Sequence, residues 1–329
     1  MAAEAPQAAV PLGPDLVWGM AFTDGGAREL ADCADGEAED FRWLHLGLAD
    51  HRTRRWIENS VELPPEVRDL LLSSDQHQRS VSQNDCVGCV IHDFERDFER
   101  TQTDRIGALR IALTPRLVVT TRLHPVRSAD IVRHRIEAGS RLDNPGAALD
   151  LLVGAVTQNI GDMARSIERE VQAAEDNFLD GHHTPSSREL ITVRRRLAQI
   201  HRLLDGMRSV FQRLERDTDV PLALKPVMEN LSQRLLGLDG DIMGIQGQLR
   251  VLRDEIDIQQ EQRTNQNLYL LSIMTALMLP VTAVTGIFGM NTGDLPLEGH
   301  GGTPMAIFLM VAAVAGTYWL LRLLGFMRR

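Results

Sequence analysis

The chain has few cysteines, a single lysine (Lys225) and fewer basic than acidic residues. Its three cysteines, Cys33, Cys86 and Cys89, are too few for a disulfide framework and fit a reducing compartment. Acidic residues outnumber basic ones by 45 to 35, so the surface should concentrate cations and repel nucleic acid. Many soluble domains are equally acidic for solubility alone, and this simpler explanation stays open.

Several kinds of motif are also missing. Residues 1–14 are rich in alanine and proline and lack the apolar core of a signal peptide, so we expect them to be disordered. No phosphate-binding glycine loop and no pairing of a nucleophile with a base stands out along the chain. We therefore expect neither an enzyme nor a bound cofactor.

Formal charge almost disappears from the last part of the chain. After Thr264 the charged residues are Asp294, Glu298, Arg322, Arg328 and Arg329. Two uncharged apolar runs result, Leu268–Phe288 and Pro304–Leu321. A helix needs about 20 apolar residues to cross a bilayer, so each run predicts a transmembrane helix.

The charges around these runs predict their orientation. Basic residues follow the second run from Arg322 onward, whereas the link between the runs carries only Asp294, Glu298 and His300 as ionisable groups. The positive-inside rule then places the link outside and both termini in the cytoplasm. We expect a multi-pass protein of the inner (plasma) membrane.

The first part of the chain mixes strand-like and helix-like segments. Apolar alternation and β-rich composition predict strands over 41–48, 86–94, 106–113 and 117–121, the last two as a hairpin. Pro64-Pro65 opens a short helix that should end near Leu72, and another follows Pro125 to about Ala138. The region is expected to be a mixed α/β domain.

From Pro145 onward the apolar residues recur with a helical period. One helix should run to about Leu179, and Ser186 or Ser187 should cap the next. A third series of apolar residues continues from Pro226 into the first membrane run without a stop signal. So long a helix is unstable alone and needs partners along its length, which predicts an oligomer.

These patterns define the expected fold class and its parts. The fold class is an α+β cytosolic domain of the α/β/α sandwich type, followed by long helices and a C-terminal two-helix transmembrane hairpin, in an oligomer. The expected parts are a disordered N-terminus (1–14), a mixed α/β domain (15–145), a cytosolic helical pair (146–225), a stalk helix (226–289) that ends as the first span (268–289), an external loop (290–303), a second span (304–324) and a basic cytosolic tail (325–329).

One face of the first span has the composition of a pore lining. Gly286 lies five residues before Asn291, and steps of three or four residues back from it give Thr282, Leu279 or Met278, Thr275, Leu271 and Leu268. Their hydroxyl groups could contact the water shell of an ion, and the large apolar side chains could close the path by dewetting. Alternatively, the hydroxyl groups bond back to carbonyl groups of their own helix.

Both spans lack aspartate, glutamate, histidine and cysteine. A site that strips water from Zn²⁺ uses histidine, cysteine or carboxylate ligands, and one that strips Mg²⁺ uses carboxylates. The sequence therefore predicts that an ion passes with its inner water shell intact. The Asn291 amide and backbone carbonyl groups would hold it.

The outer end of the first span carries the most specific motif. Gly289-Met290-Asn291, in a chain of this architecture, resembles the CorA-type metal ion transporters. Asn291, Gly293 and Pro296 are similar to the zinc-transporting, ZntB-like branch, whereas Met290 has the form of the magnesium branch. The resemblance implies a homopentamer that forms a cytosolic funnel and whose partners are its own copies, the lipid bilayer and divalent cations. It also implies Gly289, Met290 and Asn291 as an outer selectivity ring.

Two kinds of function compete at this point. The resemblance implies Zn²⁺ transport driven by an existing gradient, with a Mg²⁺ or Co²⁺ channel of the same superfamily as the alternative. A membrane-anchored signalling or scaffold protein, in which the hairpin only tethers the cytosolic domain, is the other class.

Other groups of potential metal ligands are weaker candidates. Cys86 and Cys89 with His92 resemble part of a zinc site, but on a strand the two cysteines point to opposite faces. His182-His183 is expected in a solvated loop. The stalk helix carries several acidic residues, either as a solvated face or as an acidic lining: Asp239, Asp241, Asp254, Asp257 and Glu261. We favour Asp254 and Asp257, nearest the membrane, as a cytosolic cation site.

Overall fold

The computed structural model describes residues 14–23, 26–31, 41–96, 105–289 and 302–325. The chain divides into two compact units, Met1–Arg250 and Val251–Arg329, which are considered separately. The boundary between them falls inside a helix, so the division into parts expected from the sequence stays a prediction.

The first unit contains a mixed sheet with the described strands in the order β2-β1-β3-β7-β6-β5-β4. Its strands are β1 (Leu16–Thr23), β2 (Gly26–Glu29), β3 (Phe41–Gly47), β4 (Arg79–Gln83), β5 (Cys86–Phe94), β6 (Ile106–Leu113) and β7 (Leu117–Arg122). Neighbouring strands are antiparallel except for the parallel pair of β3 and β7. The predicted hairpin is confirmed as β6 and β7.

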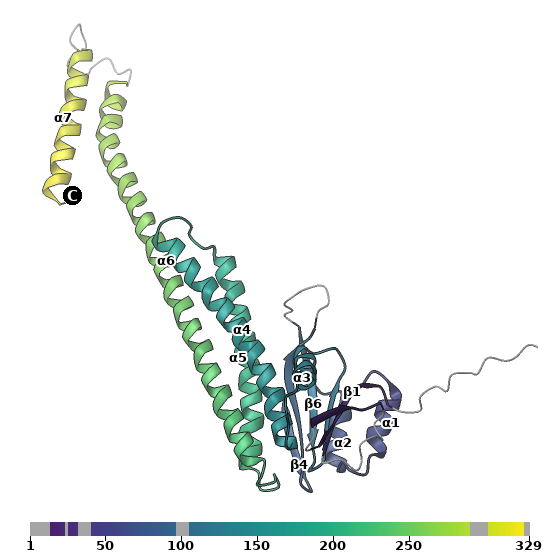
Figure 1. Ribbon diagram of the computed structural model, residues 1–329. Coiled ribbons are helices and arrows are strands. Elements are labelled where there is room, and N and C mark those ends of the chain that lie inside the picture. The colour runs from purple at the N-terminus through teal and green to yellow at the C-terminus, as the bar shows by residue number, and fades with distance from the viewer. Residues whose placement is uncertain (1–13, 24–25, 32–40, 97–104, 290–301, 326–329) are drawn as a thin grey trace, which may run out of the picture. The chain divides into compact units, whose positions relative to one another are not determined.

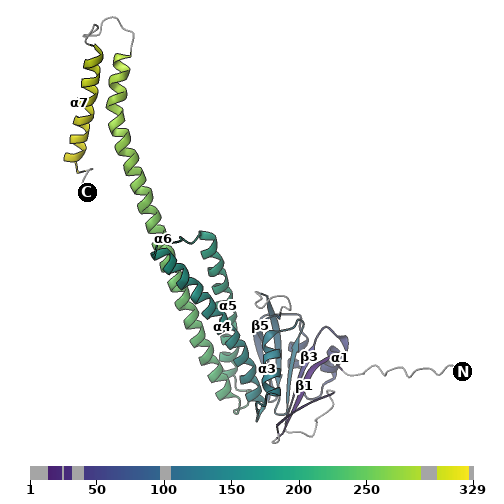
Figure 2. The same ribbon diagram turned by 45° about the horizontal axis from the view of Figure 1, so that its top comes forward.

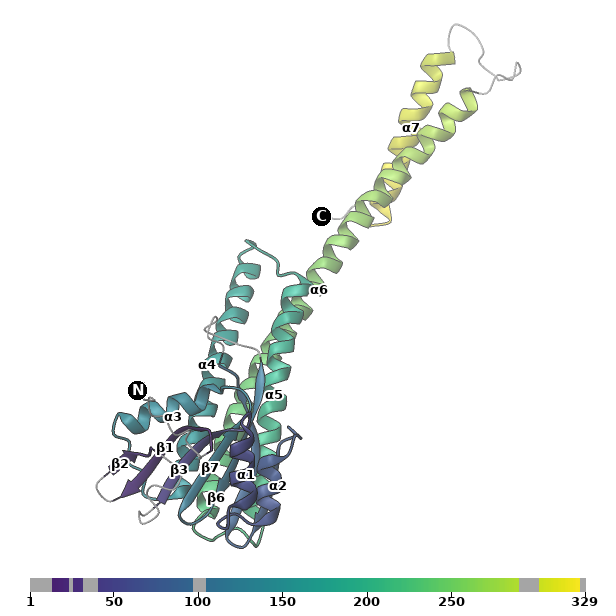
Figure 3. The same ribbon diagram turned by 90° about the vertical axis from the view of Figure 1, so that its right-hand side faces the viewer.

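Helices cover both faces of this sheet (Figures 1 and 3). One face carries α1 (His51–Asn59) and α2 (Pro65–Leu72), and the other carries α3 (Arg127–Glu137), α4 (Pro145–Leu179) and α5 (Ser187–Arg216). Val67 of α2 packs closely on Gly88 of β5. A Cβ atom at Gly88 would lie 3.3 Å from Val67 Cγ1. On the opposite face, the Asp93 carboxylate accepts a hydrogen bond from the Ser128 backbone N–H at 2.9 Å, at the start of α3. The expected α/β/α sandwich is therefore confirmed.

Because helices cover both faces of the sheet, the polar residues of strand β3 are buried. Its alternation predicted a strand correctly, but the polar positions do not face water, because all of β3 is buried. The Arg42 guanidinium pairs with the Glu62 carboxylate at 2.6 Å. His45 Nδ1 lies 2.8 Å from Thr120 Oγ1, and burial lowers the His45 pKa to about 3, so its ring is neutral.

Helices α4 and α5 each begin with a side-chain cap. Asn144 caps α4, accepting from the Ala147 N–H at 2.9 Å. Of the two predicted caps, Ser186 is the one that caps α5. Its Oγ accepts from the Glu189 N–H at 3.3 Å, and its backbone N–H donates to the Glu189 carboxylate at 2.7 Å.

Helix α6 (Lys225–Phe288) begins in the first unit and ends in the second. Up to Arg250 it packs beside α4 and α5 (Figure 2), with Leu231, Leu235 and Ile242 fully buried. The Arg234 guanidinium also pairs with the Asp150 carboxylate of α4 at 2.8 Å. The second unit contains the rest of α6 and helix α7 (Gly302–Leu323).

Candidate functional site

Two helices among the described residues are long and apolar enough to cross a membrane, α6 and the Pro304–Leu323 part of α7. Their apolar segments are not buried within the chain. Leu271, Met278 and Leu279 of α6 have 61%, 60% and 65% of their surface exposed. So many exposed apolar side chains require lipid or another protein chain around them.

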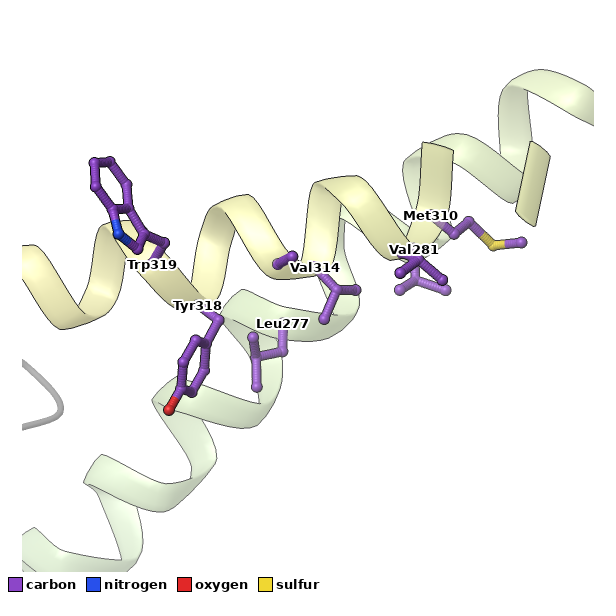
Figure 4. A pocket seen from close by; sticks show the side chains of 8 residues that line it. Leu277, Val281, Met310, Val314, Tyr318 and Trp319 are labelled. Carbon is purple, nitrogen blue, oxygen red and sulfur yellow. The ribbon is translucent and has the colours of Figure 1, made fainter. Parts of the chain in front are cut away.

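The expected pore-lining residues share one face of α6. At about 100° per residue, the six positions from Leu268 to Gly286 fall within an arc of about 80°. All six are exposed. Leu277 and Val281, which lie toward α7, are centred about 140° away from this arc (Figure 4). The expected lining face is therefore free of α7.

The hydroxyl groups on α6 bond back to their own helix, as the alternative interpretation held. Thr275 Oγ1 donates to the Leu271 carbonyl at 2.8 Å, and Thr282 Oγ1 donates to the Leu279 carbonyl at 2.9 Å. Because each hydroxyl proton is used inside the helix, the oxygen presents only acceptor lone pairs outward. Water bound to a cation points its hydrogens outward, so this arrangement is compatible with contact to a hydrated cation.

Two residues shape the outer half of the first span. Pro280 lies inside α6 and has no N–H, so the Ala276 carbonyl lacks its usual helical partner. Gly289 ends the helix, donating its N–H to the Thr285 carbonyl at 2.8 Å. A Cβ atom at Gly289 would lie 2.9 Å from the Thr285 oxygen, so a side chain there would force a shift of the backbone.

Much of the expected outer site lies outside the described residues. This holds for Met290 and Asn291 of the motif and for Asp294, Glu298 and His300 of the link. Gly289 is the member of the motif that the structure places, at the last turn of α6.

The acidic residues of α6 occupy two different environments. Asp239 is only 8% exposed, and its Oδ1 lies 2.6 Å from His201 Nδ1 of α5, with Arg208 at 3.8 Å from the other oxygen. Asp239 is therefore neither a solvated residue nor part of a lining, and that interpretation is wrong for it. Asp254 and Asp257 are exposed, and Asp257 lies 3.7 Å from Arg253 on its own helix. Cation binding by these two residues stays a prediction.

The weaker metal candidates do not form a metal centre. Cys86 and Cys89 are buried in β5, where desolvation raises the pKa of each thiol to about 12. They therefore stay protonated near neutral pH and are poor metal ligands. His182 and His183 are exposed in the turn after α4. Within the described ranges, no group of three or more histidine, cysteine, aspartate or glutamate residues is placed to hold a metal ion.

One feature that the sequence did not indicate is an apolar groove between α6 and α7, shown in Figure 4. The groove runs between Leu277 and Val281 on α6 and the Met310–Trp319 part of α7. No local pattern predicts such a feature, because it depends on how two helices lie side by side.

Comparisons with known proteins concern nearly the whole chain. Residues 38–323 match a family model described as CorA-like Mg²⁺ transporter protein. The chain is 28% identical over 315 residues to a zinc transport protein ZntB of Enterobacter sp. (strain 638), covering 94% of this chain and 95% of that protein.

Two solved structures have a similar fold. The full-length CmaX protein aligns with a TM-score of 0.77 at 22% identity, covering 95% of this chain and 98% of CmaX. The CorA magnesium transporter from Methanocaldococcus jannaschii aligns with a TM-score of 0.76 at 17% identity, covering 93% of this chain and 96% of that transporter. At these identities the likeness concerns the fold, and it confirms the expected sequence of sandwich, long helices and two C-terminal helices.

Proposed function

Because the chain belongs to the CorA-like Mg²⁺ transporter family, we propose that it carries divalent metal cations across the inner membrane. The family match confirms the resemblance that the motif indicated. Identity of 26% and 28% to zinc transport proteins favours Zn²⁺ as the ion. The alternative ion is Mg²⁺ or Co²⁺, which the description of the family and the Met290 form of the motif favour.

The exposed face of α6 that points away from α7 supports a path through a ring of subunits. In a homopentamer this face would surround the axis, and α7 would lie outside it toward lipid. Thr275, Thr282 and Gly286 would then present hydroxyl oxygens and backbone to a hydrated cation, and Leu271 and Leu279 would form apolar constrictions.

The proposed ring at the outer end consists of Gly289, Met290 and Asn291. Gly289 supports this role, since its lack of a side chain lets α6 end where the motif begins. Carbonyl and amide oxygens at that position would select an ion by its hydrated size and charge. Since no carboxylate, imidazole or thiol lies within either span, the ion would keep its inner water shell and move down an existing gradient.

The orientation of the chain follows from the same proposal. The first unit and both termini would lie in the cytoplasm, and Asp294, Glu298 and His300 would lie outside. Asp254 and Asp257 would then face the cytosolic approach to the path, where exposed carboxylates raise the local concentration of cations.

The test is ion flux in liposomes that contain the purified full-length protein. Indicators enclosed in the liposomes for Zn²⁺ and for Mg²⁺ should report entry of one ion in preference to the other. Asn291→Ala should change the flux or the preference at least severalfold, whereas Asn265→Ala, on α6 before the span, should change neither. A folded pentamer that passes no divalent cation would contradict the proposal, and a particle that is monomeric in detergent and in lipid would exclude the axial path.

A further inference from the structure

The apolar groove of the second unit has a volume of about 570 Å³. Leu277 and Val281 form its α6 wall, and Met310, Val314, Tyr318 and Trp319 form most of its α7 wall (Figure 4). In hydrocarbon such a space does not stay empty, because the lining atoms would lose their dispersion contacts. Either a lipid acyl chain or a side chain from another subunit must occupy it.

The residues of the groove favour an acyl chain. Helices that pack on one another in membranes use small residues at the contact. The groove face of α7 is instead lined mainly by methionine, valine, tyrosine and tryptophan, and Ala315 is its one small residue. The small residues Ala312, Ala313 and Gly316 are centred about 150° away around the α7 axis. A second helix would therefore pack closely on that other face, whereas a flexible chain can follow the uneven wall of the groove.

The charge at one end of the groove indicates the headgroup. Arg322 lies one turn beyond Tyr318, about 30° from the centre of the groove face, and it is exposed. Its long side chain can extend to the membrane surface while its stem stays in the hydrocarbon. We propose that the groove binds one acyl chain of an anionic phospholipid, with Arg322 at the headgroup phosphate. The proposal rests on the membrane location of α6 and α7 and not on which ion is carried.

Fluorescence quenching in vesicles tests the proposal on the full-length protein. The probes are phosphatidylglycerol and phosphatidylcholine with dibrominated acyl chains. Trp319 is the tryptophan of the second unit, and the other three, Trp18, Trp43 and Trp56, lie in the first. The Trp319 signal is therefore the difference between the wild type and Trp319→Phe. Phosphatidylglycerol should be preferred about fivefold, the effect of one arginine near an anionic surface.

Matched variants separate the groove from the general lipid shell. Arg322→Gln should bring the preference to about one. Val314→Phe, which fills the groove, should lower the quenched fraction, while Leu309→Phe on the opposite face of α7 should leave it unchanged. Native mass spectrometry of the wild type should retain phosphatidylglycerol on each subunit after detergent exchange.

Equal quenching by the two lipids in the wild type would overturn the proposal, because it would mean that only general lipid surrounds the groove. A particle free of bound lipid in the mass spectrum would overturn it as well. Ion flux measured on the same liposomes distinguishes the two proposals, since flux without lipid preference leaves transport intact and removes only the lipid site.

Discussion

The two ends of α6 place their apolar residues in opposite ways. In the first unit Met228, Leu231 and Leu235 are fully buried against neighbouring helices. In the second unit Met278 and Leu279 have 60% and 65% of their surface exposed. Water drives apolar surface into contact in the first unit, whereas lipid tails are as apolar as leucine and supply no such force. An apolar repeat of helical period therefore predicts burial inside the protein only for helices that are surrounded by water.

The largest expected effect is a difference in unfolding free energy between two leucine-to-alanine variants. Leu235→Ala should lower the free energy of unfolding by about 2–5 kcal/mol, because it removes buried methyl groups and leaves a cavity. Leu279→Ala should change it by less than about 0.5 kcal/mol, since 65% of this side chain is exposed. Urea unfolding in detergent, followed by tryptophan fluorescence, measures both. Equal costs would break the contrast between the two ends of α6.

Acid should destabilise the first unit through His45. The pKa of this histidine is about 3 in the folded state and about 6.5 when unfolded. The unfolded chain therefore binds more protons between these values, and stability falls as pH drops from about 6.5 toward 3. By pH 4.5 the loss from this group should be about 2–3 kcal/mol.

His45→Gln isolates this contribution. Unfolding of the wild type and of the variant should be compared between pH 4.5 and 7.5, and the variant should lose less stability on acidification. Leu268–Phe288 contains no histidine or carboxylate, so this span should add nothing to the acid response. The same pH slope in both proteins would show that His45 is not the acid-sensitive group.

A smaller effect separates two aspartates of α6. Asp239→Asn should cost about 1–2 kcal/mol, because it weakens a nearly buried pair with His201. Asp257→Asn should not change stability measurably, since its pair with Arg253 is exposed at 3.7 Å. If Asp257 binds a cation, its substitution should instead alter how flux depends on cytosolic Zn²⁺ or Mg²⁺. Equal thermal shifts for the two variants would remove the distinction between them.

The smallest expected effect concerns one hydroxyl group. Thr282→Val keeps the shape of the side chain and should leave the unfolding temperature unchanged. It removes an acceptor for ion-bound water, so flux should fall roughly fivefold, equivalent to one hydrogen bond. The control is Thr317→Val on α7, whose hydroxyl bonds to the Ala313 carbonyl at 2.9 Å. Equal flux from the two variants would argue against Thr282 in the path.

The sequence predicted several elements closely and missed others. The predicted bounds match α2, α4, β5 and β6. Helix α1 was missed because it is mostly polar and buries only Thr53 and Ile57. Strands β2 and β4 were missed because they lie at the edges of the sheet, where few apolar residues are needed. Strand β1 was missed as well, although most of it is apolar and buried.

The sequence by itself determined the two apolar spans, the uninterrupted α6 and the motif at its outer end, because these depend on the order of residues along one helix. Only the tertiary structure decided which polar residues are paired inside and which meet solvent. Asp239 and Asp257 look alike in sequence, yet α5 brings His201 to one, while the other is left exposed. The groove beside Tyr318 also depends on two helices lying together, since contacts between distant segments have no local pattern.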